Sequence, residues 1–119
     1  MLADRPLVYL ACPYSHPARI VREARWRQAN RAAAELMARG LLVFSPISHG
    51  HPIAEAGGLP GDWSYWQAYS RAVLSICSTV VVLRLVGWEQ SAGVAAELAI
   101  AAEQGLRVEY TDLREVDHG

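Results

Sequence analysis

Short apolar runs alternate with longer segments of mixed polarity along most of this 119-residue chain. Four of these runs, at residues 7–11, 41–44, 80–86 and 106–110, are rich in Val, Leu and Tyr. Their length and their content of β-branched and aromatic residues predict short β-strands, most of them buried.

Helices are predicted in the longer segments between these strands, over about residues 17–39, 62–76 and 91–104. Asp62 and Ser91 are suitable N-cap residues, because their side-chain oxygens can accept a hydrogen bond from the first turn of a helix. A glycine follows the first and the third segment, at the position where helices commonly end.

Glycines, prolines and polar residues dominate the connection between the second strand and the second helix, so residues 47–52 and 57–60 are predicted to form loops. The element order is therefore β-α-β-loop-α-β-α-β. This order predicts a three-layer α/β fold, Rossmann-like or flavodoxin-like, with helices on both faces of a parallel sheet of about four to five strands. We expect one domain over residues 1–119.

Ligands of such sheets bind at the carboxyl ends of the strands, near the point where the strand order reverses. Three loops with chemically informative residues are expected at this edge, at residues 12–16, 46–51 and 87–93. Their convergence predicts a binding site there.

The composition is typical of a soluble globular protein, with 52% apolar and 19% charged residues. The net charge of −1 provides no bulk attraction to nucleic acid or to a membrane, and no apolar run approaches the ~18 residues of a membrane span. Two cysteines without metal-ligand spacing fit a reduced, cytoplasmic protein. We expect no signal peptide, because charged residues precede the first apolar run, and a polar tail over residues 115–119.

One carboxylate interrupts the apolar face of the third predicted helix. At helical spacing Glu97 shares a face with Gly93, Val94 and Leu98. The start of this helix, at Ser91, offers free N–H groups and the positive end of the helix dipole to an anion. The strand, the turn and the helix therefore predict an anion-binding cradle with a carboxylate beside it.

Three arginines lie where charge is unexpected. Arg22 and Arg25 project from the apolar side of the first helix, either to cover the edge of the core and form ion pairs or to reach a phosphate near the first loop. Arg84 lies inside a predicted strand, and either pairs with an acid on a neighbouring element or faces a partner subunit.

Other common motifs are missing or weak. The chain has neither a G-x-G-x-x-G motif after its first strand nor any lysine, which excludes a P-loop lysine and a Schiff base. His49 and His51 lack a matched acid, so we expect packing or substrate contacts and neither a metal ion nor a cofactor. Cys12 fits a small buried residue better than a nucleophile. Trp66 fits the core and base stacking equally well, whereas Trp63 fits a structural role.

Two motifs in the right order suggest a family. Residues 8–14, Val-Tyr-Leu-Ala-Cys-Pro-Tyr, together with Ser91-x-Gly93-x-x-x-Glu97, resemble the nucleoside 2-deoxyribosyltransferase superfamily, which includes the deoxynucleoside-monophosphate N-glycosidases. With Gly87-Trp88-Glu89 added, the chain is more similar to a small, uncharacterised bacterial and phage branch. The resemblance covers about residues 7–110.

The resemblance implies a reaction. Glu97 corresponds to the nucleophile, which attacks the anomeric carbon, forms a covalent (deoxy)ribosyl-enzyme and releases the base to water or to an acceptor base. Tyr9 corresponds to the tyrosine that orients this glutamate, and Ser91 to a phosphate contact. The resemblance also implies a nucleoside or nucleotide as small-molecule partner and a homodimer or a larger homo-oligomer. We expect these residues to bind the substrate: Cys12, Pro13, Tyr14, Ser15, Arg22, Pro46, His49, Trp66, Ser70, Trp88, Ser91 and Gly93.

The chain departs from the family pattern at two positions. Many relatives have an aspartate on the preceding helix and another at the start of the following strand, where this chain has Ser70 and Ser78-Thr79. Loss of general-acid assistance typically lowers a rate by ~10²–10⁴. The carboxylates that remain as substitutes are Asp62, Glu55 and Glu89.

Three hypotheses therefore stand. The first is an N-glycosidase or (deoxy)ribosyltransferase that acts through Glu97. The second is a catalytically silent nucleotide-binding module, suggested by the missing aspartates. The third is a structural or subunit-interaction domain in which Glu97 pairs with an arginine such as Arg84 or Arg22.

Overall fold

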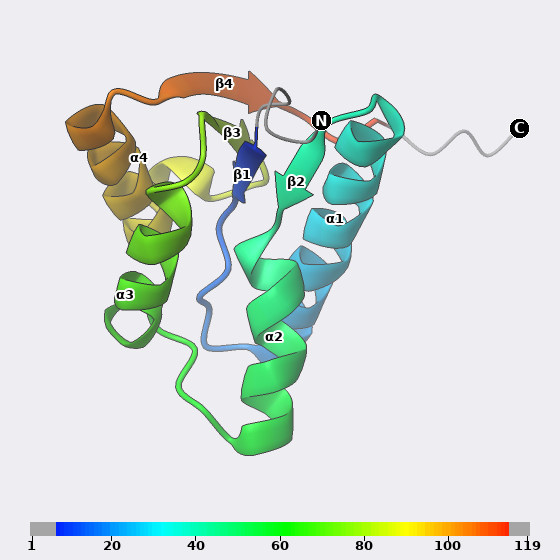
Figure 1. Ribbon diagram of the computed structural model, residues 1–119. Helices are drawn as coiled ribbons and strands as arrows, with labels where there is room; N and C mark the ends of the chain where they lie inside the picture. The colour runs from blue at the N-terminus through cyan, green and yellow to red at the C-terminus, as the bar shows by residue number, and fades with distance from the viewer. Residues whose placement is uncertain (1–6, 115–119) are drawn as a thin grey trace, which may run out of the picture.

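The computed structural model describes residues 7–114, so the predicted polar tail at residues 115–119 lies outside the described residues. Strands and helices largely alternate along the chain (Figure 1). The strands are β1 (Leu7–Ala11), β2 (Leu42–Phe44), β3 (Thr79–Leu83) and β4 (Arg107–Thr111). The helices are α1 (Arg19–Ala38), α2 (Pro46–Gly57), α3 (Trp63–Leu74) and α4 (Ala92–Gln104), with a 3₁₀ turn, η2 (Trp88–Gln90), before α4.

The four strands form one parallel sheet in the order β2-β1-β3-β4. Figure 1 shows α1 on one side of this sheet, and α3 with α4 on the other. The predicted three-layer α/β fold is therefore confirmed. The strand order reverses between β1 and β3, so the loops that follow these two strands lie at the edge where such folds bind ligands.

The two faces of the sheet have separate cores. Val8 and Leu10 of β1 pack with residues of α1 on one face. Tyr9 and Ala11 point the other way and pack with residues of α3 and α4, because successive side chains of a strand alternate between its faces. The alternation therefore directs the tyrosine of the first motif toward α4.

The prediction of a loop over residues 47–52 is wrong, because these residues belong to α2. Ser45 caps this helix by accepting a hydrogen bond from the backbone N–H of Ser48, and proline at the first helical position suits a helix start. Pro52 lies inside the helix and has no N–H to donate to the carbonyl of Ser48. The indole N–H of Trp26 donates to that carbonyl instead, at 3.4 Å. A side chain from α1 thus compensates for the proline.

The third strand is shorter than the predicted range of residues 80–86, since β3 ends at Leu83. Arg84 therefore follows the strand instead of lying inside it, and its guanidinium binds the carboxylate of Asp112 at 2.9 and 3.1 Å. Of the two environments predicted for Arg84, the structure therefore shows the pairing with an acid on a neighbouring segment. Gly87 then adopts a φ of 89°, which turns the chain into η2.

The predicted ends of α3 and α4 are close to those observed. Ser91 caps α4 by accepting from the N–H of Val94 at 3.2 Å, and Gly105 ends that helix with a φ of 67°. Asp62 occupies the N-cap position of α3, but its carboxylate accepts from the hydroxyl of Ser64 and makes no capping bond to the backbone. Among residues 7–114, no helix has the length and apolarity that crossing a membrane requires.

Candidate functional site

A cavity of about 350 Å³ opens at the carboxyl ends of the strands, between α2, α3 and the start of α4. Its walls come from the loop after β1, from both of these helices and from the turn before α4. The three segments expected at this edge therefore do converge, although residues 46–51 form the start of α2 and not a loop. Ten of the residues predicted to act in a site line the cavity: Cys12, Tyr14, Ser15, Pro46, His49, Trp66, Ser70, Ser91, Gly93 and Glu97.

Glu97 and Tyr9 form a buried pair at the base of this cavity. Glu97 is only 5% exposed, and Tyr9 is fully buried and donates its hydroxyl hydrogen to a carboxylate oxygen of Glu97. Burial raises the pKa of Glu97 to about 8, although the hydrogen bond from Tyr9 acts in the opposite direction. Burial and the charge of Glu97 raise the pKa of Tyr9, so its hydroxyl remains a donor. The carboxyl group therefore changes charge near neutral pH.

The ion pairs on which the third hypothesis depends do not form. Arg84 binds Asp112, and Arg22 binds two backbone carbonyls, of His16 at 2.6 Å and of Pro17 at 3.1 Å. Glu97 has no ion-pair partner among residues 7–114 and faces a cavity. A buried carboxylate of this kind is more typical of a functional site than of a structural salt bridge.

The start of α4 borders the cavity next to Glu97. Ala92 and Gly93 are its first helical residues, and the N–H groups of a first helical turn lack partners within the helix. Both residues line the cavity, and a Cβ added at Gly93 would meet only the hydroxyl oxygen of Ser91, at 3.8 Å. An anion could therefore approach this helix end closely.

An aromatic wall closes one side of the cavity. Trp66 and Tyr69 extend from α3 with their rings 6.0 Å apart, and Tyr69 stacks on His49 of α2 and bonds its Nε2 at 2.9 Å. The indole N–H of Trp66 donates to the carbonyl of Pro60 at 2.7 Å. Trp66 thus lines the cavity outside the main core, whereas Trp63 both packs against the core and reaches the cavity.

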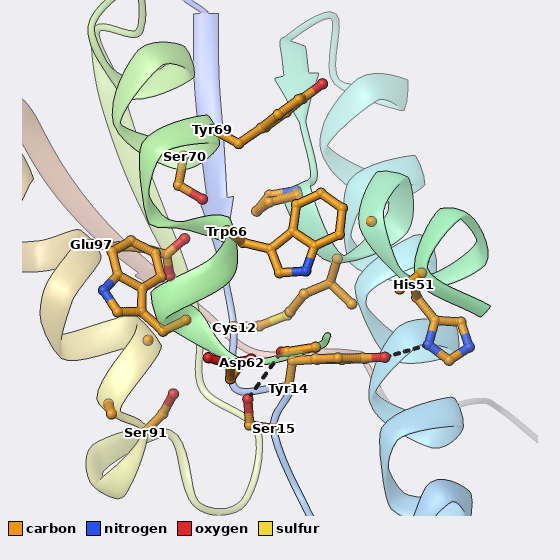
Figure 2. A pocket seen from close by; sticks show the side chains of 18 of the residues that line it. Cys12, Tyr14, Ser15, His51, Asp62, Trp66, Tyr69, Ser70, Ser91 and Glu97 are labelled. Atoms are coloured by element: carbon orange, nitrogen blue, oxygen red, sulfur yellow. Dashed lines mark hydrogen bonds between the residues drawn. The ribbon is translucent and has the colours of Figure 1, made fainter. Parts of the chain in front are cut away.

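A second tyrosine–histidine pair lies across the cavity. The hydroxyl of Tyr14 and Nδ1 of His51 are 2.6 Å apart, and His51 is 6% exposed. The ring of His51 rests 4.9 Å from the indole of Trp26. Figure 2 shows Glu97 and the Tyr14–His51 pair on opposite sides of the cavity, with Trp66 between them.

Arg25 holds the loops that frame the site. Its guanidinium donates to the carbonyl of Ser15 at 3.0 Å and to that of Val86 at 3.3 Å, which ties the loop after β1 to the turn before α4. Arg22 lines a neighbouring cavity of about 690 Å³ that shares Tyr14 and Asp62 with the first. Arg22 and Arg25 therefore hold backbone carbonyls in place, and neither forms the ion pair that was one of the two expectations for them.

Three residues predicted to bind the substrate do not line the cavity beside Glu97 (the main cavity). Pro13 is buried within the loop after β1, Arg22 lines the neighbouring cavity, and Trp88 packs against the core 5.7 Å from the ring of Tyr110. Of the positions without the family aspartate, only Ser70 lines the main cavity, because Ser78 and Thr79 lie at the amino end of β3.

Several residues on the cavity wall were absent from the predicted site. The predicted binding set contains His49 but not His51, although packing or a substrate contact is expected of both. Tyr69 could have been found from its helical spacing to Trp66. The residues added by the structure are Ile47, Gly50, His51, Ala54, Gly61, Asp62, Trp63, Tyr69, Gln90 and Ala92.

The carboxylates considered as substitutes are exposed. Asp62 lies at the rim, Glu55 binds Arg19 at 3.3 Å, and Glu89 lies on the surface. Within residues 7–114, no group of three or more His, Cys, Asp or Glu side chains is arranged to hold a metal ion. Besides Asp62, the ionisable side chains that line the cavity include Glu97 and the two tyrosine–histidine pairs.

A family model described as a domain of unknown function (DUF1937) matches residues 6–112, and the chain therefore belongs to this family. A search of curated proteins finds no significant match. The family description assigns no activity, so the functional argument rests on the cavity and its residues.

Proposed function

We propose that this DUF1937 protein cleaves the N-glycosidic bond of a nucleoside or nucleoside 5′-monophosphate, or transfers its (deoxy)ribosyl group, with Glu97 as the nucleophile. The observation that carries the proposal is a buried carboxylate that is hydrogen-bonded to Tyr9, open to a cavity and close to a helix N-terminus. The sequence resemblance to the nucleoside 2-deoxyribosyltransferase superfamily supports the same roles for both residues.

The chemistry requires a carboxylate beside the anomeric carbon. Cleavage of a glycosidic bond passes through an oxocarbenium-like state, which a nearby carboxylate stabilises and can trap as an ester. Tyr9 holds one oxygen of Glu97, which leaves the other free to form the bond to the sugar. Water or a second base then releases the sugar, which makes the protein a hydrolase or a transferase.

The remaining walls suit the other parts of a nucleotide. The free N–H groups at the start of α4 and the hydroxyl of Ser91 suit a 5′-phosphate. The indole of Trp66 offers an apolar face to a base. The cavity of about 350 Å³ lies within the size range of small-molecule sites.

The direct test is base release from a panel of nucleosides and their 5′-monophosphates, followed by chromatography. Glu97→Ala should lower the rate by about 10³-fold or more, because it removes the nucleophile. Glu103→Ala is the matched control, since Glu103 lies on the same helix with its side chain 62% exposed. Equal activity of Glu97→Ala and Glu103→Ala would exclude the mechanism. Intact-protein mass spectrometry of the quenched reaction should show the added sugar in the wild type and in Glu103→Ala, but not in Glu97→Ala.

The silent nucleotide-binding module is the second candidate, and one observation favours it. With a pKa of about 8, Glu97 is mostly protonated at neutral pH, and a protonated carboxyl group is a poor nucleophile. Binding of a nucleotide without base release, at pH 9 as well as at pH 7, would support this candidate.

We also propose that the protein is a homo-oligomer of the cytoplasm. Large apolar side chains are exposed on and just after α3, among them Tyr65 at 48% and Ile76 at 70%, and such residues suit a subunit contact. Cys12 and Cys77 are buried and unpaired, which fits a reducing compartment. Light scattering after size-exclusion chromatography tests the first point, and a mass equal to one chain would exclude it.

A further inference from the structure

A nitrogenous base leaves a sugar most readily when it receives a proton during bond cleavage. Two of the described residues that line the main cavity carry carboxyl groups, Glu97 and Asp62. The proposed reaction uses Glu97 as the nucleophile. Asp62 is exposed, and the hydroxyl of Ser64 lowers its pKa, so it is an anion at neutral pH and has no proton to give. The proton must therefore come from another group.

Tyr14 is placed to supply it. Its ring lines the cavity, and its hydroxyl lies 2.6 Å from Nδ1 of the buried His51. Burial raises the pKa of Tyr14, so the hydroxyl retains its proton in the free protein. The indole of Trp26 lies against His51 and is itself held by its bond to the carbonyl of Ser48. The pair is thus fixed on the wall opposite Glu97 (Figure 2).

We infer that Tyr14 is the general acid that protonates the departing base, and that His51 positions the hydroxyl of Tyr14. This inference rests on the proposed function. A substrate with its anomeric carbon at Glu97 would extend its base across the cavity, beneath Trp66 and toward Tyr14. The reacting sugar and the protonated base then occupy opposite ends of one site.

The step balances in atoms and charge. A carboxylate oxygen of Glu97 bonds to the anomeric carbon while the carbon–nitrogen bond breaks, and the electron pair of that bond stays with the base. The base takes the hydroxyl proton of Tyr14, whose oxygen becomes a phenolate held against Nδ1 of His51. The carboxylate of Glu97 becomes a neutral ester, and its negative charge passes to the oxygen of Tyr14. When water later cleaves the ester, the released proton returns to the oxygen of Tyr14.

The other tyrosine–histidine pair is less suited to this role. Tyr69 is 44% exposed, and its partner His49 is only partly buried, so bulk water competes for the proton. It nevertheless provides a matched control, because Tyr69→Phe removes the same hydroxyl from the same kind of pair on the same cavity.

The experiment compares two substrates that differ only in how much the leaving base needs a proton. For a purine substrate the pair is a guanine nucleotide and its N7-methyl derivative, whose base leaves already neutral. For a pyrimidine substrate the pair is a uracil nucleotide and its 5-fluoro derivative, whose base is a weaker proton acceptor. The base that the wild-type protein releases decides which pair is used.

Tyr14→Phe should lower kcat for the unmodified substrate by about 10²-fold or more and for the activated substrate by less than about fivefold. His51→Gln should show the same selectivity with a smaller loss, and Tyr69→Phe should change the rates of both substrates by the same factor. A group that only shapes the cavity would affect both substrates equally.

Three outcomes would overturn the inference. Equal losses on both substrates would make Tyr14 a structural residue, and no loss on either would remove it from the reaction. In both cases a rate that still depends on Glu97 would leave the proposed function standing. If the wild-type protein releases no base from any substrate, even an activated one, the proposed function fails and the inference fails with it.

Discussion

Helix α4 carries two glutamates in opposite environments. Glu97 is 5% exposed, is bonded to a buried tyrosine and lines the cavity. Six residues later, Glu103 lies on the surface and pairs with Arg71 at 3.2 Å, with both side chains more than half exposed. The two carboxyl groups are chemically identical, so only their environments distinguish them. Burial disfavours the ionised form of Glu97 and raises its pKa, a perturbation that functional sites often show.

The pH profile of the reaction is the strongest test of this contrast. Burial raises the pKa of Glu97 to about 8, and the nucleophile must be ionised, so kcat/KM should rise about tenfold per pH unit below that value. Between pH 6 and pH 8 the increase should approach about 10²-fold, followed by a plateau. Glu103→Gln should have the same profile. Activity that stays constant from pH 5 to pH 9 would contradict the role of Glu97.

Tyr9→Phe should sharpen the contrast further. The hydrogen bond from Tyr9 lowers the pKa of Glu97, so its loss should shift the rising part of the pH–rate profile to higher pH. A hydrogen bond to a charged group is worth about 1.5–3 kcal/mol, which corresponds to about one to two pH units. The rate at pH 7 should fall by about 10- to 100-fold and should recover in part at pH 9. If the rising part of the profile lies at the same pH in Tyr9→Phe as in the wild type, Tyr9 does not stabilise the carboxylate.

Stability should respond to pH in the direction that burial dictates. The pKa of Glu97 is higher in the folded protein than in the unfolded chain, so the folded state binds the proton more tightly. The free energy of unfolding should therefore be highest below about pH 4.5 and should decrease as the pH rises toward 8. Glu97→Gln lacks this decrease and should exceed the wild type at pH 9 by on the order of 3 kcal/mol.

Urea unfolding of the wild type and of Glu97→Gln at pH 5, 7 and 9 measures this difference. The gap between the two should be small at pH 5 and should widen toward pH 9. A gap that does not change with pH would show that Glu97 titrates normally in the folded protein.

The smallest effect is expected at the surface pair. Glu103→Gln should change the free energy of unfolding by less than about 1 kcal/mol, because exposed ion pairs are screened by water and salt. The same unfolding experiment at low and high salt measures this change, and moderate salt should abolish it. A loss of several kcal/mol would mean that the pair is more important to α4 than its exposure indicates.

Much of the fold could be predicted because its signals are local. The apolar runs mark the four strands, and Ser91 and Gly105 mark the ends of α4 within one residue. Glu97 stood out because a carboxylate on an apolar helix face is costly to bury. These signals arise from neighbouring residues, so they are visible along the chain.

The missed parts of the site depend on residues far apart in the chain. Helix α2 contains Pro52, which predicts a break, and only the indole of Trp26 on another helix provides the missing hydrogen bond. Tyr14 was predicted to bind the substrate, but its pairing with His51, 37 residues along the chain, was not.

The amino-acid sequence by itself determined the strands, the parallel order of the elements, the caps of α4 and the unusual position of Glu97. Only the tertiary structure decided that Glu97 meets Tyr9 at a cavity, that α2 forms one of its walls, and that Arg22 and Arg25 bind carbonyls instead of carboxylates. Capping and hydrophobic periodicity act over a few residues, whereas hydrogen-bond partners and burial depend on segments that folding brings together.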